Sequence, residues 1–260
     1  MLFVHGWPVS GATFRTLLPH LASQLTCHVI DLPGAGSSRF SPTTTLSVQQ
    51  HVVSVRRVVD LLGLQDVAVV GHDSGGLIAR HAMVEDPRLR SLALIDTEQS
   101  TGLSLRFTSF LAAGKLPGIS GALGHIAGHR SLRQQAFRGT FVDRSLLDGE
   151  FCEFFLAPLS VNRDRRDAAA RLLRTFDTGL VHQLAALHAR LQVPVGLIWG
   201  AKDPFFPLER THDMLGTFPN ASLTIIENAA LFSHEEQPAA VAHNLLPLLL
   251  GKDTSPAAAT

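Results

Sequence analysis

One segment limits what this chain can fold into more than any other. Residues 67–76 read Val-Ala-Val-Val-Gly-His-Asp-Ser-Gly-Gly, an apolar run that ends in a cluster of glycines. The apolar run predicts a buried strand, and the amphipathic residues that follow Gly75 predict a helix. A strand joined to a helix by so short a turn needs small residues on both sides of the tip of the turn. The segment therefore predicts a strand–turn–helix unit of an α/β fold.

The spacing of the glycines selects the residue at the tip of this turn. If Asp73 is at the tip, the residues two before and two after it are Gly71 and Gly75. If Ser74 is at the tip, the residue two before it is His72, whose imidazole would clash with the helix. We therefore predict that Asp73 holds the position of a nucleophile and that Ser74 contributes its backbone N–H. A carboxylate there would attack an sp3 carbon and form an ester, whereas a serine would be acylated.

The rest of the core alternates short apolar runs with helix-length amphipathic segments. This is the pattern of a mostly parallel sheet flanked by helices on both faces, and it predicts the fold class α/β. The expected strands are Leu2–His5, Cys27–Asp31, Val67–Gly71, Leu92–Asp96, Val195–Trp199 and Ser222–Glu227. The expected helices are Ala12–Gln24, Val48–Leu62, Gly75–Glu85, Leu208–Thr217 and Glu235–Leu250. Pro19 and Pro247 fall inside two of these helices, where proline removes a backbone donor.

Helical patches replace the strands in the middle of the chain. They lie at Leu103–Ala113, Leu132–Phe137, Ser145–Phe155 and Ala168–Arg174. A helical insertion between two strands is expected to cover the strand ends, where open α/β sheets bind ligands. We predict an α/β-hydrolase-type core of residues 1–97 and 191–251, a helical cap of residues 98–190 and a disordered tail of residues 252–260.

Composition argues against several classes of function. The formal net charge is zero, which gives no support to a nucleic-acid partner or an acidic membrane. The longest apolar run, residues 245–250, is too short to span a bilayer. Cys27 and Cys152 lie far apart, as is typical of reduced cysteines in a cytoplasmic protein. No metal site is expected, because His125 and His129 lie in a glycine-rich segment that predicts a poor helix. We expect a cytoplasmic protein that needs no metal or cofactor and acts on a small apolar organic substrate. Whether the chain forms a homodimer is left open.

Three further motifs accompany the turn at residues 71–75. They are Val-His-Gly-Trp-Pro at 4–8, Asp-Leu-Pro-Gly-Ala-Gly at 31–36 and Gly-Ala-Lys-Asp-Pro at 200–204. With the turn, they resemble the epoxide hydrolase and haloalkane dehalogenase branch of the α/β-hydrolase superfamily over nearly the whole chain. The resemblance implies that Asp73 is the nucleophile and that Asp203 is the acid that orients a histidine. It also implies an oxyanion hole formed by the backbone N–H groups of Trp7 and Ser74. Asp96, after the preceding strand, is a second position for the acid.

The chain departs from this branch at the histidine. The branch places it in a segment of the form Gly-His-aromatic-x-x-x-Glu-x-Pro, whereas residues 230–238 read Ala-Leu-Phe-Ser-His-Glu-Glu-Gln-Pro. Counting back from Pro238 puts Leu231 on the histidine position and His234 three residues later. Three residues displace a side chain by about 4–5 Å along a helix, too far for a base that needs a hydrogen bond of about 3 Å. Two interpretations stay open: a remodelled loop brings His234 into the site as base, or the hydrolytic base is absent.

The groups that would activate the substrate are also missing from the sequence. Epoxide hydrolases of this kind use cap tyrosines to protonate the epoxide oxygen, and this chain contains no tyrosine. Haloalkane dehalogenases hold the halide with a tryptophan beside the nucleophile, where this chain has Ser74. The leading hypothesis is an epoxide hydrolase-like enzyme in which Asp73 attacks an sp3 carbon of a small to medium apolar substrate. The alternatives are a cofactor-free lyase, isomerase or cyclase of secondary metabolism that uses Asp73 as acid or base, and a catalytically silent ligand-binding protein.

Overall fold

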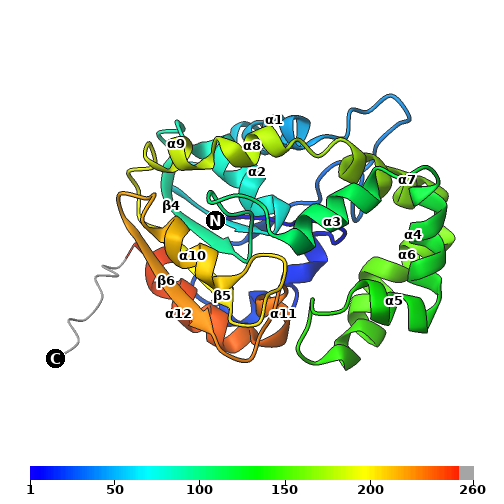
Figure 1. Cartoon of the computed structure of the whole chain (residues 1–260). Helices are drawn as coiled ribbons and strands as arrows, with labels where there is room; N and C mark the ends of the chain where they lie inside the picture. The colour runs from blue at the N-terminus through cyan, green and yellow to red at the C-terminus, as the bar shows by residue number, and fades with distance from the viewer. Residues whose placement is uncertain (252–260) are drawn as a thin grey trace.

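A sheet of six parallel strands forms the centre of the protein, whose computed structural model describes residues 1–251 (Figure 1). Along the sheet the strands follow the order β2-β1-β3-β4-β5-β6, and every neighbouring pair is parallel. Their bounds are β1 Leu2–Val4, β2 His28–Val29, β3 Val67–His72, β4 Leu89–Ile95, β5 Val195–Gly200 and β6 Ala221–Ile226. The six predicted strands and the predicted α/β fold class are thereby confirmed, with strand ends shifted by a few residues.

The alternation of side chains along each strand builds a separate apolar core on each face of the sheet. On β1, Leu2 and Val4 belong to one core and Phe3 to the other, and β3 and β4 alternate in the same way. Helices α1 and α2 cover the first face, and α12 covers the second (Figure 1). The bounds are α1 Val48–Leu61, α2 Ser74–Met83, α10 Leu208–Leu215 and α12 Pro238–Leu249. Three of the five expected helices are thus continuous α-helices close to the predicted bounds, those at α1, α2 and α10.

Two predicted helices are wrong in detail, and proline accounts for both differences. The helix expected at residues 12–24 is instead two 3-10 turns, η1 (Gly11–Phe14) and η2 (Leu18–His20), with Pro19 inside the second. The helix expected at residues 235–250 is split into α11 (Ser233–Glu236) and α12, which starts at Pro238. Proline fits the first turn of a helix but disfavours the α conformation of the residue before it.

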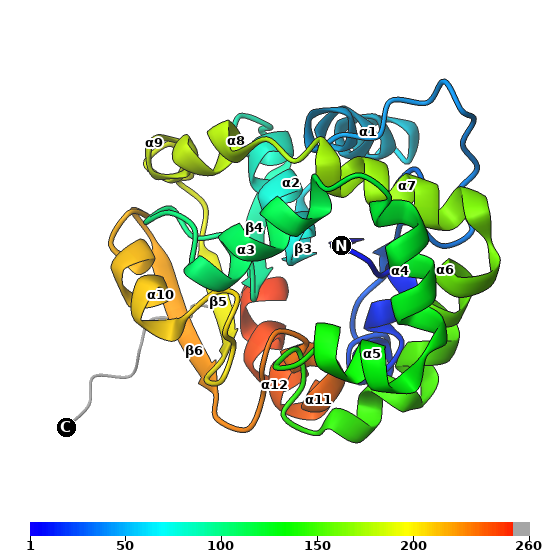
Figure 2. The ribbon, with the colours of Figure 1, turned by 45° about the vertical axis from the view of Figure 1, so that its right-hand side comes forward.

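The chain between β4 and β5 is entirely helical or irregular. Its helices are α3 Leu105–Gly114, α4 Ile119–Gly128, α5 Arg130–Ala136, η3 Arg144–Asp148, η4 Cys152–Leu156, α6 Ala157–Val161, α7 Arg163–Arg174, α8 Thr178–His182 and α9 Leu184–His188. Figure 2 shows α4 to α7 gathered on one side of the strands, with α3 between them and α10. We call α3 to α9 the inserted helices; they occupy the stretch that the sequence assigns to a cap.

Helix α4 corrects the expectation that the glycine-rich segment around His125 is a poor helix. Its glycines lower helix propensity, but one of them permits close packing, since a Cβ on Gly124 would lie 3.0 Å from the Arg166 side chain on α7. His125 and His129 remain near one another, with ring centroids 4.1 Å apart. Across residues 1–251, however, the structure holds no group of three or more His, Cys, Asp or Glu side chains suited to a metal ion.

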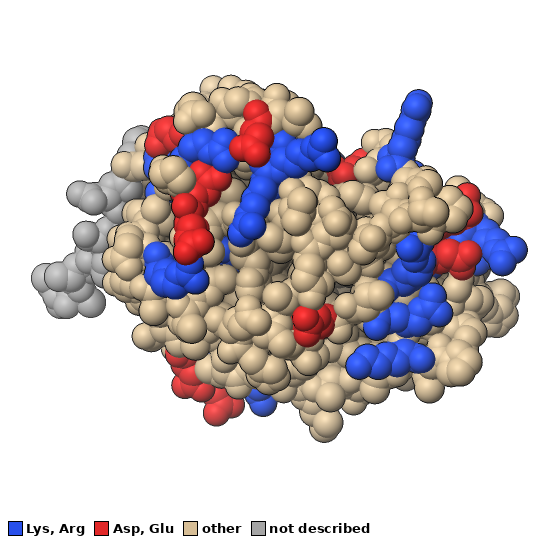
Figure 3. All heavy atoms as spheres, turned by 90° about the horizontal axis from the view of Figure 1, so that it is seen from above, with Lys and Arg blue, Asp and Glu red and all other residues tan. Residues whose placement is uncertain are grey.

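Two further sequence-based expectations concern the surface and the tail. Among the described helices, none is long and apolar enough to cross a membrane. Acidic and basic side chains both appear on the face in Figure 3. The predicted disordered tail, residues 252–260, lies outside the described residues.

Candidate active site

The candidate site lies where the order of the strands reverses. The chain passes from β1 to β2 on one side and then returns to β3 on the other side of β1. In open α/β sheets, ligands bind at the carboxyl ends of the strands at such a point. Here Trp7 follows β1 and Asp73 follows β3. Asp73 has φ 50° and ψ −135°, a conformation that costs a residue other than glycine about 1–3 kcal/mol and is typical of functional sites.

The glycines around Asp73 hold the turn as the sequence predicts. A Cβ on Gly71 would lie 2.6 Å from the Cα of Gly76, at the start of α2. A Cβ on Gly75 would overlap the carbonyl oxygen of Val4, at the end of β1. Neither position has room for a side chain, so the turn of β3 into α2 packs directly against the backbone of β1.

A backbone N–H group binds the carboxylate of Asp73. The Trp7 N–H donates to Oδ2 at 2.7 Å. The Ser74 hydroxyl lies 3.4 Å from the same Oδ2. Burial raises the pKa of Asp73 well above its usual value, and the nearby Glu98 carboxyl raises it further, while hydrogen bonding from the backbone opposes the shift. Of the two predicted oxyanion donors, the Trp7 N–H is therefore bonded to Asp73, and the role of the Ser74 N–H stays a prediction.

A mostly apolar cavity of about 260 Å³ opens beside Asp73. Its apolar lining includes Trp7, Phe107, Phe110, Phe137, Phe176, Phe205, Leu231 and Phe232. The polar side chains on its wall are Asp73, Ser74, Glu98 and Thr140. Pockets for drug-sized ligands measure roughly 300–1,000 Å³, so this cavity, which we call the main cavity, suits a small apolar molecule.

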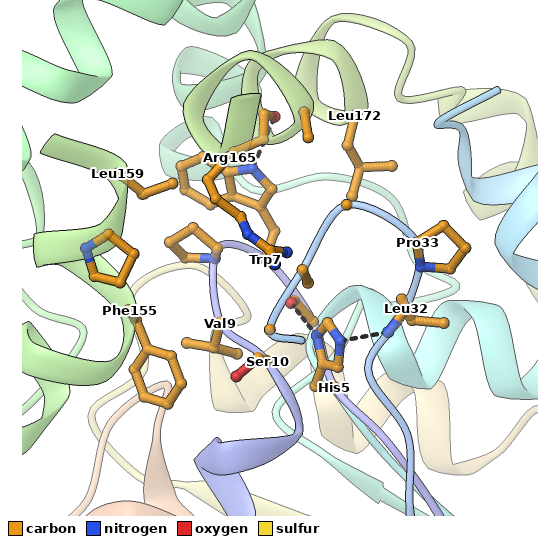
Figure 4. Close-up of a pocket in the computed structure, with 18 of the residues that line it drawn as sticks. His5, Trp7, Val9, Ser10, Leu32, Pro33, Phe155, Leu159, Arg165 and Leu172 are labelled. Carbon is orange, nitrogen blue, oxygen red and sulfur yellow. Dashed lines mark hydrogen bonds between the residues drawn. The ribbon is translucent and has the colours of Figure 1, made fainter. Parts of the chain in front are cut away.

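A smaller cavity of about 100 Å³ also borders Trp7 (Figure 4). Trp7, Pro8 and Ser74 line both cavities, whereas Asp73 lines the main one. His5 borders the smaller cavity, and its Nε2 accepts a hydrogen bond at 3.0 Å from the backbone N–H of Leu32. His5 thus joins the end of β1 to the loop at residues 31–36, a structural role.

Asp203, the predicted acid, is buried without the histidine that an acid of this kind orients. Its Oδ1 accepts hydrogen bonds from the backbone N–H groups of Phe205 and Phe206, at 2.7 and 3.2 Å. Its Oδ2 is buried and has no hydrogen-bond partner among residues 1–251. Burial raises the pKa of Asp203 to about 7, against the two N–H donors. Leu231, at the predicted histidine position, lines the main cavity with Asp73.

The raised pKa of Asp203 predicts a stability that falls with rising pH. The folded protein keeps this proton up to about pH 7, whereas the unfolded chain loses it near the ordinary aspartate value of about 4. Between these two pKa values the folded state binds more protons than the unfolded state. The contribution of Asp203 to the free energy of unfolding is therefore complete at low pH and is lost as pH rises through 7.

We therefore expect Asp203→Asn, which stays neutral, to stabilise the protein more at pH 8 than at pH 5, by about 3 kcal/mol at most. Chemical denaturation at both pH values measures the difference. Asp213→Asn, at an exposed carboxylate of α10, is the matched control and should leave the pH dependence as it is. An Asp203→Asn variant whose stability follows pH as the wild type does would contradict this expectation.

His234 lies away from Asp73, which corrects the alternative that it serves as base. Its Nε2 contacts the Thr13 hydroxyl at 2.9 Å, and its ring is fully buried, with centroids 5.3 Å from Phe14 and 4.3 Å from His72. Burial lowers the pKa of His234 well below its usual value, so the ring is neutral. The hydrogen bond from the Ala230 N–H to Glu236, at 2.7 Å, holds this loop in the register that the sequence implies.

Asp96, the second predicted position for the acid, makes structural hydrogen bonds with both of its carboxylate oxygens. Its Oδ1 accepts from the Gly200 N–H at 2.7 Å and its Oδ2 accepts from the Ser233 hydroxyl. It therefore ties the end of β4 to β5 and to α11.

Sequence reasoning missed Glu98 and Arg80. Glu98 lies just after the end of β4 and is one of the residues that line the main cavity. The sequence signal for Glu98 was an acidic residue soon after a buried strand, but the prediction there named only Asp96. Arg80 is fully buried in α2 and donates to the carbonyl oxygen of Gly76, to His188 and to Thr97. The sequence did not predict this buried position of Arg80, because an arginine in an amphipathic helix is expected on the exposed face.

Comparisons with known proteins agree with this fold. The model of the alpha/beta hydrolase family matches residues 1–244. The pimeloyl-[acyl-carrier protein] methyl ester esterase of Chromobacterium violaceum is 25% identical over 246 residues, covering 91% of this chain and 89% of that protein. The soluble epoxide hydrolase of Corynebacterium sp. (strain C12) is 39% identical over 79 residues, 30% of this chain and 27% of that protein. The structure of the epoxide hydrolase CorEH without ligand aligns with TM-score 0.78 and 23% identity over 96% of this chain and 90% of that one, a likeness of fold.

Proposed function

The chain belongs to the alpha/beta hydrolase family, and within it we propose an epoxide hydrolase-like enzyme that forms a covalent ester on Asp73. The observation that carries this proposal is the placement of Asp73: it occupies a strained turn, lines the main cavity, and has Oδ2 bound by the backbone N–H of Trp7. This leaves Oδ1 to attack a carbon atom in the cavity. The ester carbonyl oxygen would then remain at the N–H groups of Trp7 and Ser74, which stabilise its negative charge when water adds.

The main cavity supports a small to medium apolar substrate. Its wall is largely aromatic and aliphatic, and its few polar side chains gather at Asp73. We propose that the inserted helices act as a cap, because Phe107 and Phe110 of α3 and Phe137, directly after α5, line the cavity together with Asp73. Such a cap would exclude bulk water and strengthen the electrostatic interactions in the site.

A serine esterase is less well supported by this geometry. The residue in the strained conformation is Asp73, while Ser74 is the first residue of α2 and its hydroxyl points at the Asp73 carboxylate. An ester substrate would therefore meet a carboxylate rather than an activated hydroxyl. The methyl ester hydrolysis named for the Chromobacterium violaceum relative would need a different arrangement of the turn.

Acid–base chemistry without a covalent intermediate is the second candidate. It is favoured by the raised pKa of Asp73 and by the leucine at position 231, since proton transfer by Asp73 needs no hydrolysis of an ester. A lyase, isomerase or cyclase of this kind would leave no adduct on Asp73.

A panel of apolar epoxides, assayed for diol, tests the proposed function. We expect diol from at least one short-chain epoxide such as 1,2-epoxyhexane, and no labelling by a serine-directed fluorophosphonate. Fluorophosphonate labelling of Ser74 together with hydrolysis of methyl esters would support a serine esterase instead. If no epoxide yields diol and an apolar ligand still raises the melting temperature, the catalytically silent ligand-binding alternative is favoured.

A further inference from the structure

Glu98 is a second buried carboxyl group on the wall of the main cavity. Its side chain has no exposed surface, and it lines the same cavity as Asp73. Its Oε1 is buried and has no hydrogen-bond partner within residues 1–251. The other oxygen, Oε2, lies 2.9 Å from the Thr97 hydroxyl. A buried carboxyl oxygen without a partner is costly, and this oxygen is available to a ligand or a reacting group.

The hydrogen bonds of Thr97 place a proton on Glu98. The Thr97 oxygen lies 2.8 Å from the backbone carbonyl oxygen of Asp73 and 3.0 Å from Nη2 of Arg80. A carbonyl only accepts and a guanidinium only donates, so the single hydroxyl hydrogen of Thr97 goes to Asp73. The 2.9 Å contact with Glu98 Oε2 is then a hydrogen bond only if Glu98 is the donor, which requires its neutral form.

The charges around the site limit how many of the two carboxyl groups are ionised. Buried Arg80 places its Nη2 4.0 Å from Glu98 Oε2. One buried positive charge balances one of the two carboxylates, Asp73 and Glu98, so the other retains a proton. Burial raises the pKa of both groups, an ionised Glu98 raises that of Asp73 further, and Arg80 lowers that of Glu98. The Trp7 N–H favours the ionised form of Asp73 and Arg80 that of Glu98, so the hydrogen bonds of Thr97 are what place the proton on Glu98.

We propose that Glu98 is the proton donor that opens the epoxide and then the base that activates water for ester hydrolysis; this inference rests on the proposed function. In the first step a bond forms between Asp73 Oδ1 and the epoxide carbon, and the carbon–oxygen bond of the ring breaks. The epoxide oxygen takes the proton of Glu98, whose carboxyl group presents it by turning about its Cγ–Cδ bond. The product is a hydroxyalkyl ester of Asp73 and a Glu98 carboxylate next to Arg80.

In the second step Glu98 recovers its proton. A water oxygen adds to Cγ of Asp73 while one water proton passes to the Glu98 carboxylate. When the ester bond breaks, the second water proton goes to the departing alcohol, which leaves as the diol. Asp73 is again a carboxylate and Glu98 again a carboxylic acid. One residue thereby supplies the proton that no tyrosine can supply in this chain and the base that is missing at Leu231.

The test compares Glu98→Gln with the wild type on two reagents of the same length, 1,2-epoxyhexane and 1-bromohexane. Glutamine keeps the size of the side chain but cannot exchange a proton with the substrate. We expect Glu98→Gln to lower the rate of epoxide opening by about 10²–10⁴-fold, the usual worth of general acid catalysis. Alkylation by the bromide needs no proton donor, so its rate on Asp73 should change little, and intact-mass measurement should show the hexyl adduct accumulating in the variant.

Glu235→Gln is the matched control, because Glu235 is buried but bonds to Arg15 and Thr13 outside the cavity. The pH profile separates a chemical role from a structural one and remains decisive if the bromide reacts with neither protein. Epoxide opening by the wild type should fall at alkaline pH as Glu98 loses its proton, whereas the residual rate of Glu98→Gln should not follow that titration.

The outcomes separate this inference from the proposed function. If the wild type forms diol and Glu98→Gln forms it equally fast, the role of Glu98 is overturned and the role of Asp73 stands. If epoxide opening and bromide alkylation fall together and the pH profile keeps its shape, Glu98 only supports the structure and the inference is also overturned. If the wild type forms neither diol nor adduct with any reagent, the proposed function itself fails.

Discussion

Asp73→Asn is expected to abolish diol formation, lowering the rate by about 10⁴-fold or more, as loss of a covalent nucleophile does in other enzymes. The amide keeps an oxygen for the Trp7 N–H, which lies 2.7 Å from Oδ2 in the wild type, so the turn should remain folded. It also removes a carboxylate whose pKa burial raises, so the variant should be at least as stable as the wild type at neutral pH. Diol assay and thermal unfolding of the same preparation measure both effects.

The combination of lost activity and retained stability is the informative result for Asp73. A variant that still forms diol at a comparable rate would contradict a covalent role for this residue. A variant that loses activity only because it unfolds would show a lower melting temperature. Asp213→Asn, on the surface of α10, controls for the loss of an aspartate elsewhere.

Leu231→His is expected to accelerate hydrolysis of the Asp73 ester by about 10²–10⁴-fold, because it adds a base at the position that the sequence motif assigns to the histidine. Leu231 lines the main cavity, and its carbonyl oxygen is fixed by a hydrogen bond from His72 Nε2 at 2.9 Å. Asp203 offers a buried Oδ2 that has no partner in the described part of the chain and is suited to accept a hydrogen bond from the new imidazole.

The effect should be clearest in Glu98→Gln, where the ester is expected to accumulate. Adding Leu231→His to that variant should shorten the lifetime of the hexyl adduct, followed by intact-mass measurement over time. Leu231→Gln is the matched control, since it introduces a polar side chain of similar size that cannot act as a base. If the histidine variant retains the adduct as long as the glutamine variant does, Leu231 is not at the position that we infer.

The parts of the structure that were predictable depend on local steric rules. The turn at Asp73 could be predicted because a Cβ at Gly71 or Gly75 overlaps backbone atoms, so the sequence there tolerates only glycine. The strands could be predicted because both faces of the sheet are buried, which makes each strand a short apolar run. The register of Leu231 followed from Pro238, where α12 begins.

The parts that were not predictable depend on contacts between distant segments. Glu98 acquires its significance from Arg80 on α2 and from Thr97, which holds the backbone of Asp73. His234 resembled a displaced base in the sequence, but its ring packs with Phe14 on the opposite core of the sheet. Helix α4 forms in spite of its glycines because tertiary packing against α7 overrides their low helix propensity.

Single-turnover reaction in water enriched in oxygen-18 tests most directly whether Asp73 attacks the substrate. With the protein in excess over 1,2-epoxyhexane, we expect the first diol to contain only oxygen-16, because its new hydroxyl comes from the carboxylate of Asp73. The label should appear in the peptide that contains Asp73, detected by mass spectrometry after proteolysis. Oxygen-18 in the first diol together with an unlabelled Asp73 peptide would show that water attacks the epoxide directly and would contradict the covalent role of Asp73.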